Sequence, residues 1–251
     1  MHTSSGESIR ASMIPTIFKI KKQNIRGAFG APLFRRKMKK YDYVIWDFNG
    51  TVLDDVEAGI RSVNTLLAER NLKTIDSVEY YRSVFRFPVI DYYKTIGFDF
   101  DIEPYEEIAP KWVALYLENV KSSGIYNDVK QTLDLFNKNG IKQCILSASE
   151  INMLTKQLTE LGIVNDFEQI MGIDNIHAGS KLAPAYAWRE AHKTAKVLFI
   201  GDTDHDVDAA KALGADCVLV CRGHQSREYL ETLGVDVCDD LYAVRDMVLC
   251  K

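Results

Sequence analysis

The sequence has no apolar run that approaches the roughly 18 residues a helix needs to cross a bilayer, and its five cysteines include no Cys-x-x-Cys pair. It also lacks internal repeats and low-complexity tracts. The missing apolar run excludes a predicted transmembrane helix, and the missing cysteine pairs argue against a short zinc or redox motif. An odd number of cysteines, most of them in apolar runs, is typical of reduced core thiols, so we expect a cytoplasmic protein.

The chain also lacks a large net charge of either sign. The formal net charge is −4 over 251 residues, which gives no reason to expect nucleic acid or an anionic membrane as a partner, and no pattern indicates an oligomeric state. The charge is uneven, because residues 1–40 carry ten basic residues and a single acid, Glu7. We expect this segment to be a disordered extension, with Met38 as an alternative start. An organelle transit peptide or a basic tail that touches nucleic acid are the other interpretations.

Short runs that are apolar at nearly every position alternate with helical patterns. Such runs are typical of buried parallel strands, and alternation with helices predicts an α/β fold with a Rossmann-like parallel sheet covered on both faces. The predicted strands are residues 41–46, 141–146, 167–173, 196–201 and 216–221. The predicted helices that separate the later strands are residues 128–140, 150–162, 182–193 and 206–215.

Residues 55–124 interrupt this alternation, because they contain helical patterns and no convincing strand. We expect them to form an inserted α-helical cap domain between the two parts of the core, residues 41–54 and 125–251, with hinges near 54–56 and 123–126. The predicted cap helices are residues 58–71, 77–85, 89–97 and 105–123.

Polar residues that can do chemistry follow the predicted strands. Asp47 follows the first strand, Ser147 the second, and Asp202 and Asp206 the fourth, while Lys181 precedes the helix that leads into the fourth strand. Ligands of open parallel sheets bind beyond the carboxyl ends of the strands, so we expect these side chains to meet at one rim.

The predicted set suits phosphate chemistry. Carboxylates cannot lie together unpaired without raising one another's pKa, and Mg²⁺ resolves this because it binds carboxylate and phosphate oxygens together. Ser147 and Lys181 can hold further phosphate oxygens, and Asp47 can attack phosphorus to form an aspartyl-phosphate.

Four segments carry a resemblance to a known family: DFNGTVLD from Asp47, ILSAS around Ser147, AGSKL around Lys181, and GDTDHDVDAA with Asp202 and Asp206. Residues 41–251 resemble the haloacid dehalogenase-like hydrolase superfamily, in the phosphoglycolate phosphatase-like branch with a helical cap.

The resemblance implies a role for each matching residue. Asp47 would be the nucleophile and a metal ligand, and the backbone carbonyl of Asn49 a second ligand. Lys181 would pair with the nucleophile and with phosphate. Thr51 and Ser147 would bind phosphate. Asp202 would bind Mg²⁺, and Asp206 would bind it directly or through water.

Asn49 departs from the family's pattern, because the phosphatases of the family usually carry a second aspartate at this position. That acid protonates the leaving oxygen and later activates water, and an amide does neither. Loss of general acid–base help typically costs roughly 10²–10⁴-fold in rate, which is about 3–5 kcal/mol. Three interpretations follow: a phosphatase whose substrate has a good leaving group or which borrows another acid, a slow phosphatase, or a catalytically inactive module that binds phosphate ligands or a protein.

Other polar residues have an ordinary and a functional interpretation. Arg82 and Arg86 are spaced to share a helix face, where they would close over an anionic substrate or face solvent. His205 is a candidate substitute acid, although we expect it to face solvent. Asp55 is a metal ligand or a helix cap, and His224 is expected to be structural. We therefore predict a Mg²⁺-dependent phosphohydrolase acting on a small phosphorylated metabolite.

Overall fold

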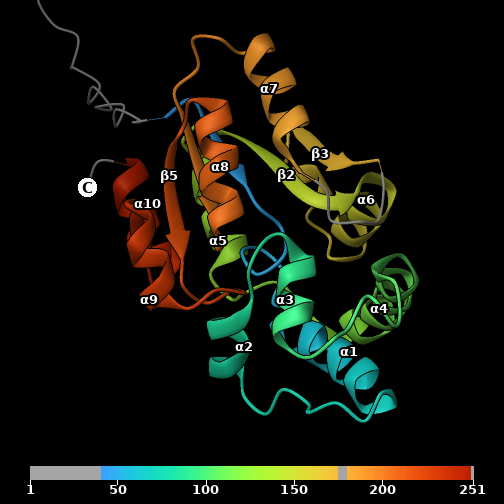
Figure 1. Cartoon of the computed structure of the whole chain (residues 1–251). Helices are drawn as coiled ribbons and strands as arrows, with labels where there is room; N and C mark the ends of the chain where they lie inside the picture. Colours follow the sequence, from blue (N-terminus) through green and yellow to red (C-terminus); the bar gives the residue numbers. More distant parts are fainter. Residues whose placement is uncertain (1–40, 175–179, 250–251) are drawn as a thin grey trace, which may run out of the picture. The chain divides into compact units, whose positions relative to one another are not determined.

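The computed structural model describes residues 41–174 and 180–249, all within one compact unit (Figure 1). The predictions made for residues 1–40 lie outside the described residues. None of the described helices is both long enough and apolar enough to cross a membrane.

The described core contains a parallel sheet with the strand order β3-β2-β1-β4-β5-β6. The five predicted strands are confirmed, and a short sixth strand was missed because it has only three residues. The direction in which successive strands are added reverses at β1, which pairs with β2 on one side and β4 on the other, so the switch point of the sheet lies at β1. The strands are β1 (Tyr43–Trp46), β2 (Lys142–Glu150), β3 (Gln169–Ile173), β4 (Val197–Gly201), β5 (Asp216–Val220) and β6 (Asp236–Cys238).

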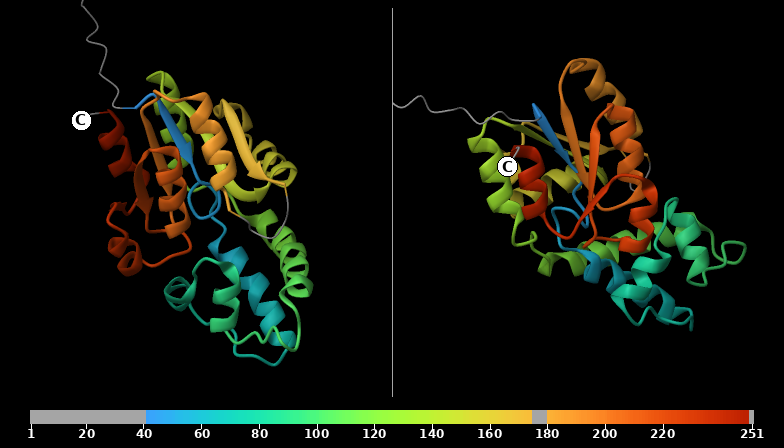
Figure 2. Two further views of the ribbon diagram at one scale, coloured as in Figure 1. Left: turned by 45° about the horizontal axis from the view of Figure 1, so that its top comes forward. Right: turned by 90° about the vertical axis from the view of Figure 1, so that its left-hand side faces the viewer.

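Helices cover both faces of the sheet (Figure 2). On β1, Val44 and Trp46 pack in one cluster with Phe136, whereas the alternate residues Tyr43 and Ile45 pack in another cluster with residues of α7 and α8. These helices are α5 (Val129–Lys138), α6 (Ile151–Glu160), α7 (Leu182–Ala191) and α8 (Asp204–Leu213), all predicted, together with α9 (Arg227–Leu230) and α10 (Leu241–Leu249), which were not predicted.

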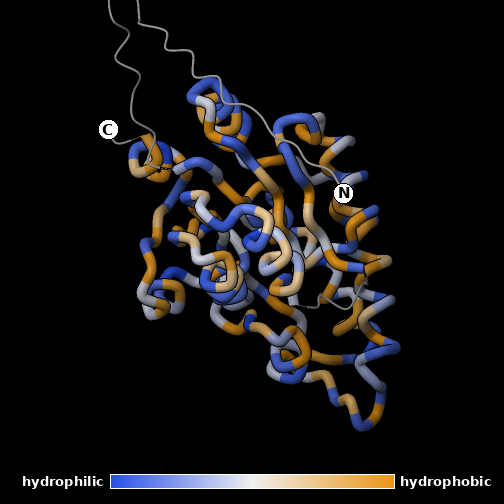
Figure 3. The backbone as a smooth tube through the Cα atoms, turned by 90° about the horizontal axis from the view of Figure 1, so that it is seen from above, coloured by the Kyte–Doolittle hydropathy of each residue, from blue (hydrophilic) through white to orange (hydrophobic). Residues whose placement is uncertain are grey.

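The segment between β1 and α5 is helical, as predicted, and the fold class with its helical cap is confirmed. Hydrophobic and hydrophilic residues alternate along the chain's helices (Figure 3), and the cap helices bury their apolar residues in a cluster that contains Leu67, Tyr81 and Ile108. The domain boundaries at residues 55 and 124 stay a prediction. The cap helices are α1 (Val56–Glu69), α2 (Val78–Val84), α3 (Val89–Thr95) and α4 (Tyr105–Asn119), which the short helix η1 (Val120–Ser122) extends.

Candidate active site

Three buried carboxylates meet at the carboxyl ends of β1 and β4. Asp47 follows β1, Asp202 follows β4, and Asp206 lies in the first turn of α8. One oxygen of each lies within 4.8 Å of an oxygen of the others. The strands bring them together because Trp46 and Ile200 are paired in register, so the predicted convergence of acids from distant segments is present in the structure.

Lys181 is the cation of this cluster. It precedes α7, is buried, and its Nζ atom lies 2.7 Å from Asp47 Oδ1 and 2.5 Å from Asp206 Oδ1. Burial raises the pKa of Asp47 well above its usual value, against the lowering effect of Lys181, and the charges of Asp206 and Asp202 raise it further. Burial and Asp206 likewise raise the pKa of Asp202 to about 6.

The cluster therefore carries more negative charge than Lys181 neutralises. A set of buried carboxylate oxygens at this spacing suits a hard divalent cation such as Mg²⁺, which would relieve the repulsion that raises these pKa values. Asp47, Asp202 and Asp206 are the residues that could hold it.

Backbone glycines make room for Asp202. Gly50 has a φ of +71°, a conformation that favours glycine, and a Cβ atom there would lie 2.4 Å from Asp202 Oδ2. A Cβ atom on Gly223, in the loop after β5, would lie 2.1 Å from the same oxygen. Two loops thus close around the carboxylate, which accepts hydrogen bonds from the Thr51 hydroxyl and the His224 backbone N–H at 2.9 and 2.7 Å.

Ser147 reaches the same cavity as Asp47 and Lys181. The prediction ended the second strand at residue 146, but β2 continues to Glu150 with a register irregularity after Leu146, so Ser147 lies within the strand and not after it. Its hydroxyl accepts a hydrogen bond from the backbone N–H of Ser149 at 3.1 Å. Ser147 therefore lines one cavity together with Asp47, at the rim where the sequence predicted both.

Thr51 and Arg86, two of the predicted phosphate-binding residues, do not line the cavity that contains Asp47. Thr51 is buried, gives its hydroxyl to Asp202 and does not line the cavity. Arg86 lies beyond the end of α2, with its guanidinium 3.7 Å from the ring centre of Tyr229, and it does not line the cavity either. The expectation that it shares a helix face with Arg82 is wrong, because the helix ends at Val84.

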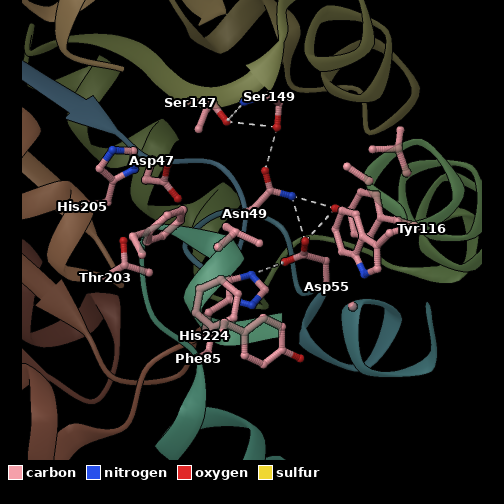
Figure 4. Close-up of a pocket in the computed structure, with 18 of the residues that line it drawn as sticks. Asp47, Asn49, Asp55, Phe85, Tyr116, Ser147, Ser149, Thr203, His205 and His224 are labelled. Atoms are coloured by element: carbon pink, nitrogen blue, oxygen red, sulfur yellow. Dashed lines mark hydrogen bonds and ion pairs between the residues drawn. The ribbon is translucent and has the colours of Figure 1, made fainter. Parts of the chain in front are cut away.

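The side chain of Asn49 is held by hydrogen bonds on both sides (Figure 4). Its Nδ2 atom donates to Asp55 Oδ2 at 2.8 Å and to the Tyr116 hydroxyl at 2.6 Å, and its Oδ1 atom accepts from the Ser149 hydroxyl at 2.9 Å. The Tyr116 hydroxyl in turn donates to Asp55 Oδ2 at 2.6 Å. The amide therefore joins the loop after β1 to α4 of the cap and to β2.

Asp55 is neither a member of the acidic cluster nor a helix cap through its side chain. Its carboxylate accepts from the backbone N–H of Gly50 at 2.8 Å and lies 3.4 Å from Nε2 of His224. Burial alone would raise the pKa of Asp55, but His224 and the hydrogen bonds lower it. The pKa of His224 rises to about 9 because Asp55 outweighs the opposite effect of burial.

His224 and His205 both line the cavity. The sequence analysis missed this for His224 and gave it only as the less favoured interpretation for His205. Neither has a spacing signal, because His224 comes from the loop after β5 and its partners Asp55 and Tyr81 come from the cap. His205 was expected to face solvent, but its ring packs 4.5 Å from the ring of Phe87 and its Nδ1 atom is buried. Burial and Lys181 lower the pKa of His205.

The cavity above the carboxylates has a volume of about 170 Å³. One side includes Asp47, Asp202, Lys181 and the serines of β2, and the other consists of cap residues. The cap side is mainly aromatic: Tyr81, Phe85, Phe87, Tyr92, Trp112 and Tyr116. Core and cap thus enclose one site, with the polar groups gathered at the strand ends.

Comparison with known proteins places the chain in a family. A family model for haloacid dehalogenase-like hydrolases matches residues 44–220. A phosphoglycolate phosphatase of Colwellia psychrerythraea is 25% identical over 217 residues, which cover 82% of this chain and 96% of that protein. One of Pseudomonas savastanoi pv. phaseolicola is 27% identical over 221 residues, covering 83% of this chain and 79% of that protein.

A solved structure shares the fold. Protein tyrosine kinase A of Mycobacterium tuberculosis has a TM-score of 0.70 at 19% identity, covering 83% of this chain and 98% of that one. Identity this low shows the fold alone, and an activity has to be argued from the site. The family match includes the loop with Asp47, the β2 segment with Ser147 and the α8 segment with both further acids, and it spans well over half of the 251 residues. The chain therefore belongs to the haloacid dehalogenase-like hydrolase family.

Proposed function

We propose that the protein is a Mg²⁺-dependent phosphatase that hydrolyses a small phosphorylated metabolite in the cytoplasm through an aspartyl-phosphate on Asp47. The observation that carries this is the buried cluster of Asp47, Asp202 and Asp206 with Lys181 as its one paired cation. Three carboxylates, two of them with raised pKa values, are costly to bury together unless they serve a bound cation or phosphate. The relatives named phosphoglycolate phosphatase agree with this chemistry.

Each residue has a part in binding or in the reaction. Asp47, Asp202 and Asp206 would hold Mg²⁺, which supplies positive charge to a phosphate that carboxylates would otherwise repel. Lys181 holds Asp47 by its Oδ1 atom and presents an ammonium group to the phosphate oxygens. Ser147 offers a hydroxyl to the same group.

The reaction has two steps. A carboxylate oxygen of Asp47 forms a bond to phosphorus while the bond from phosphorus to the ester oxygen breaks, and the electron pair leaves with that oxygen. Water then attacks the phosphorus of the aspartyl-phosphate, loses a proton to solvent, and releases phosphate as Asp47 regains its carboxylate. Closure of the aromatic cap side over the site keeps other water away.

Asn49 gives neither step a proton donor or acceptor, since its amide is already bound to Asp55, Tyr116 and Ser149. This observation supports a second candidate function, a module that binds phosphate ligands or a protein without turnover. The two candidates differ in whether a phosphorylated form of Asp47 is produced.

Trapping the phosphoenzyme distinguishes these candidates. The full chain with Mg²⁺ and ³²P-labelled acetyl phosphate, quenched in acid, should retain label that hydroxylamine removes. Asp47→Asn should retain none, whereas Asp54→Asn, an exposed acid in the same loop, should retain as much as wild type. Label on Asp47→Asn would refute the assignment of the nucleophile, and absence of label and of phosphate release in the wild type would favour the binding module.

A further inference from the structure

The fixed charges of the cavity are unfavourable for a carboxylate on the substrate. Among the described residues that line it, the positively charged side chains are Lys181, bound to Asp47 and Asp206, and His224, paired with Asp55. Glu150 adds a carboxylate, which accepts hydrogen bonds from two backbone N–H groups in the first turn of α6 at 2.9 Å each. An acid such as phosphoglycolate would therefore find no uncommitted cation on this part of the wall and would meet negative charge.

The cap side offers apolar, flat surfaces instead. Phe85 lies 5.5 Å from Phe87 and 5.1 Å from Tyr92 between ring centres, and Trp112 stacks on Tyr116 at 4.9 Å. These contacts hold the rings in fixed orientations, so they form a preformed apolar wall. Aromatic side chains favour a bound ring at offset or edge-on geometry, and a cavity of about 170 Å³ has room for one ring beside a phosphate.

One polar atom in this wall has no partner within the described chain. Tyr92 lines the cavity, and its hydroxyl is buried and forms no hydrogen bond with the described residues. An unpaired buried hydroxyl is unfavourable, and a neutral polar atom on a bound molecule would satisfy it. The side chain therefore indicates where a ligand carries a hydroxyl, ether or carbonyl oxygen.

Among the described residues, the position of the family's second acid holds an amide that cannot protonate the leaving oxygen. The amide of Asn49 is committed to Asp55, Tyr116 and Ser149, and the ring of His205 packs against Phe87 with its Nδ1 atom buried. The organic group must then depart with the electron pair of the broken bond and take its proton from water afterwards. A phenolate does this readily because its conjugate acid has a pKa of about 10, far below the value of about 16 for water, which an alkoxide resembles.

We propose that the substrate is an aryl phosphate monoester, uncharged apart from its phosphate and bearing one neutral polar group that reaches Tyr92. This inference rests on the proposed function and specifies its substrate class. An oxygen of Asp47 bonds to phosphorus, the bond from phosphorus to the aryl oxygen breaks, and the aryloxide leaves and is protonated by water.

Turnover of four phosphates by the full chain with Mg²⁺ tests the proposal: acetyl phosphate, phosphoglycolate, phenyl phosphate and 4-hydroxyphenyl phosphate. We expect kcat/KM for phenyl phosphate to exceed that for phosphoglycolate at least tenfold. Equal or faster turnover of phosphoglycolate would overturn the inference while leaving the phosphatase in place. Failure to cleave even acetyl phosphate through Asp47 would instead remove the proposed function, and the inference with it.

Two tyrosine variants test the polar contact. The 4-hydroxyl adds a hydrogen-bonding group at nearly constant leaving-group basicity, so the wild type should prefer 4-hydroxyphenyl phosphate to phenyl phosphate several-fold. Tyr92→Phe should abolish this preference and keep turnover of phenyl phosphate, which also shows that the variant folds. Tyr80→Phe, a change at an exposed tyrosine of the cap, should keep the preference. A preference that survives in Tyr92→Phe would contradict the assigned contact.

Discussion

Replacing Asn49 by aspartate should make the fold sensitive to pH. The amide that donates to Asp55 Oδ2 at 2.8 Å and to Tyr116 at 2.6 Å becomes a carboxylate that cannot donate. Two unit negative charges at 2.8 Å repel by about 6 kcal/mol at an effective dielectric constant of 20, which corresponds to about four pKa units. The cation of His224 beside Asp55 offsets part of this repulsion.

The sign of the effect follows from the raised pKa of the introduced carboxyl group. The unfolded chain loses that proton near pH 4, whereas the folded protein keeps it until a higher pH. The folded state of Asn49→Asp therefore loses stability, relative to wild type, as pH rises above about 4. With a folded pKa near 7, the additional loss between pH 5 and pH 8 amounts to about 2–3 kcal/mol.

Urea unfolding in EDTA at pH 5 and pH 8 measures this loss. Asn49→Ala is the matched control, because it removes the same hydrogen bonds without adding charge, so its difference from wild type should be the same at both pH values. If the two variants shifted in parallel across this range, the introduced carboxyl would not face Asp55, and the described network around Asn49 would be wrong.

Two further predictions concern His224 and the acidic cluster. The pKa of His224 is about 9 in the folded protein and about 6.5 in the unfolded chain, so the stability that its ion pair contributes is complete below pH 6.5 and is lost as pH rises through 9. The wild type should therefore lose stability over this pH range relative to His224→Gln. If the stabilities of the two proteins changed in parallel with pH, the ion pair with Asp55 would be contradicted. Mg²⁺ should raise the melting temperature of the wild type at pH 7.5 by several degrees and that of Asp202→Asn much less. The control Asp208→Asn, which changes an exposed acid that pairs with Lys211, should respond like the wild type. Equal responses of all three proteins would exclude Asp202 as a ligand.

The sequence predicted the sheet and the acidic cluster because both are encoded locally. Asp47 and Asp202 directly follow apolar runs, and strand ends in a parallel sheet meet at one rim. Thr51 was assigned to phosphate from its position in a motif, and Arg86 was considered for the substrate from its spacing to Arg82. The direction of a side chain depends on its neighbours, however: Asp202 accepts a hydrogen bond from the hydroxyl of Thr51, and Tyr229 stacks against Arg86.

Other features left no local pattern. β6 and α9 are only three and four residues long, too short for a periodic signal. The set of Asp55, Tyr116 and His224 is assembled from α1, α4 and the loop after β5, so its members are far apart in the sequence and share no spacing. An unusual residue, Asn49, was the one hint that this corner of the site is built differently, and its partners became visible only in three dimensions.

Tyr116 has a mechanical consequence. Its hydroxyl contacts Asn49 and Asp55 together, and Asp55 in turn holds the backbone of Gly50. A swing of α4 away from the sheet would break both hydrogen bonds of the Tyr116 hydroxyl, one to Asn49 and one to Asp55, and so remove a support of the turn at Gly50. Opening of the cap at α4 and loosening of the loop after β1 would therefore occur together, and this loop would have all its supporting hydrogen bonds only when the cap is closed.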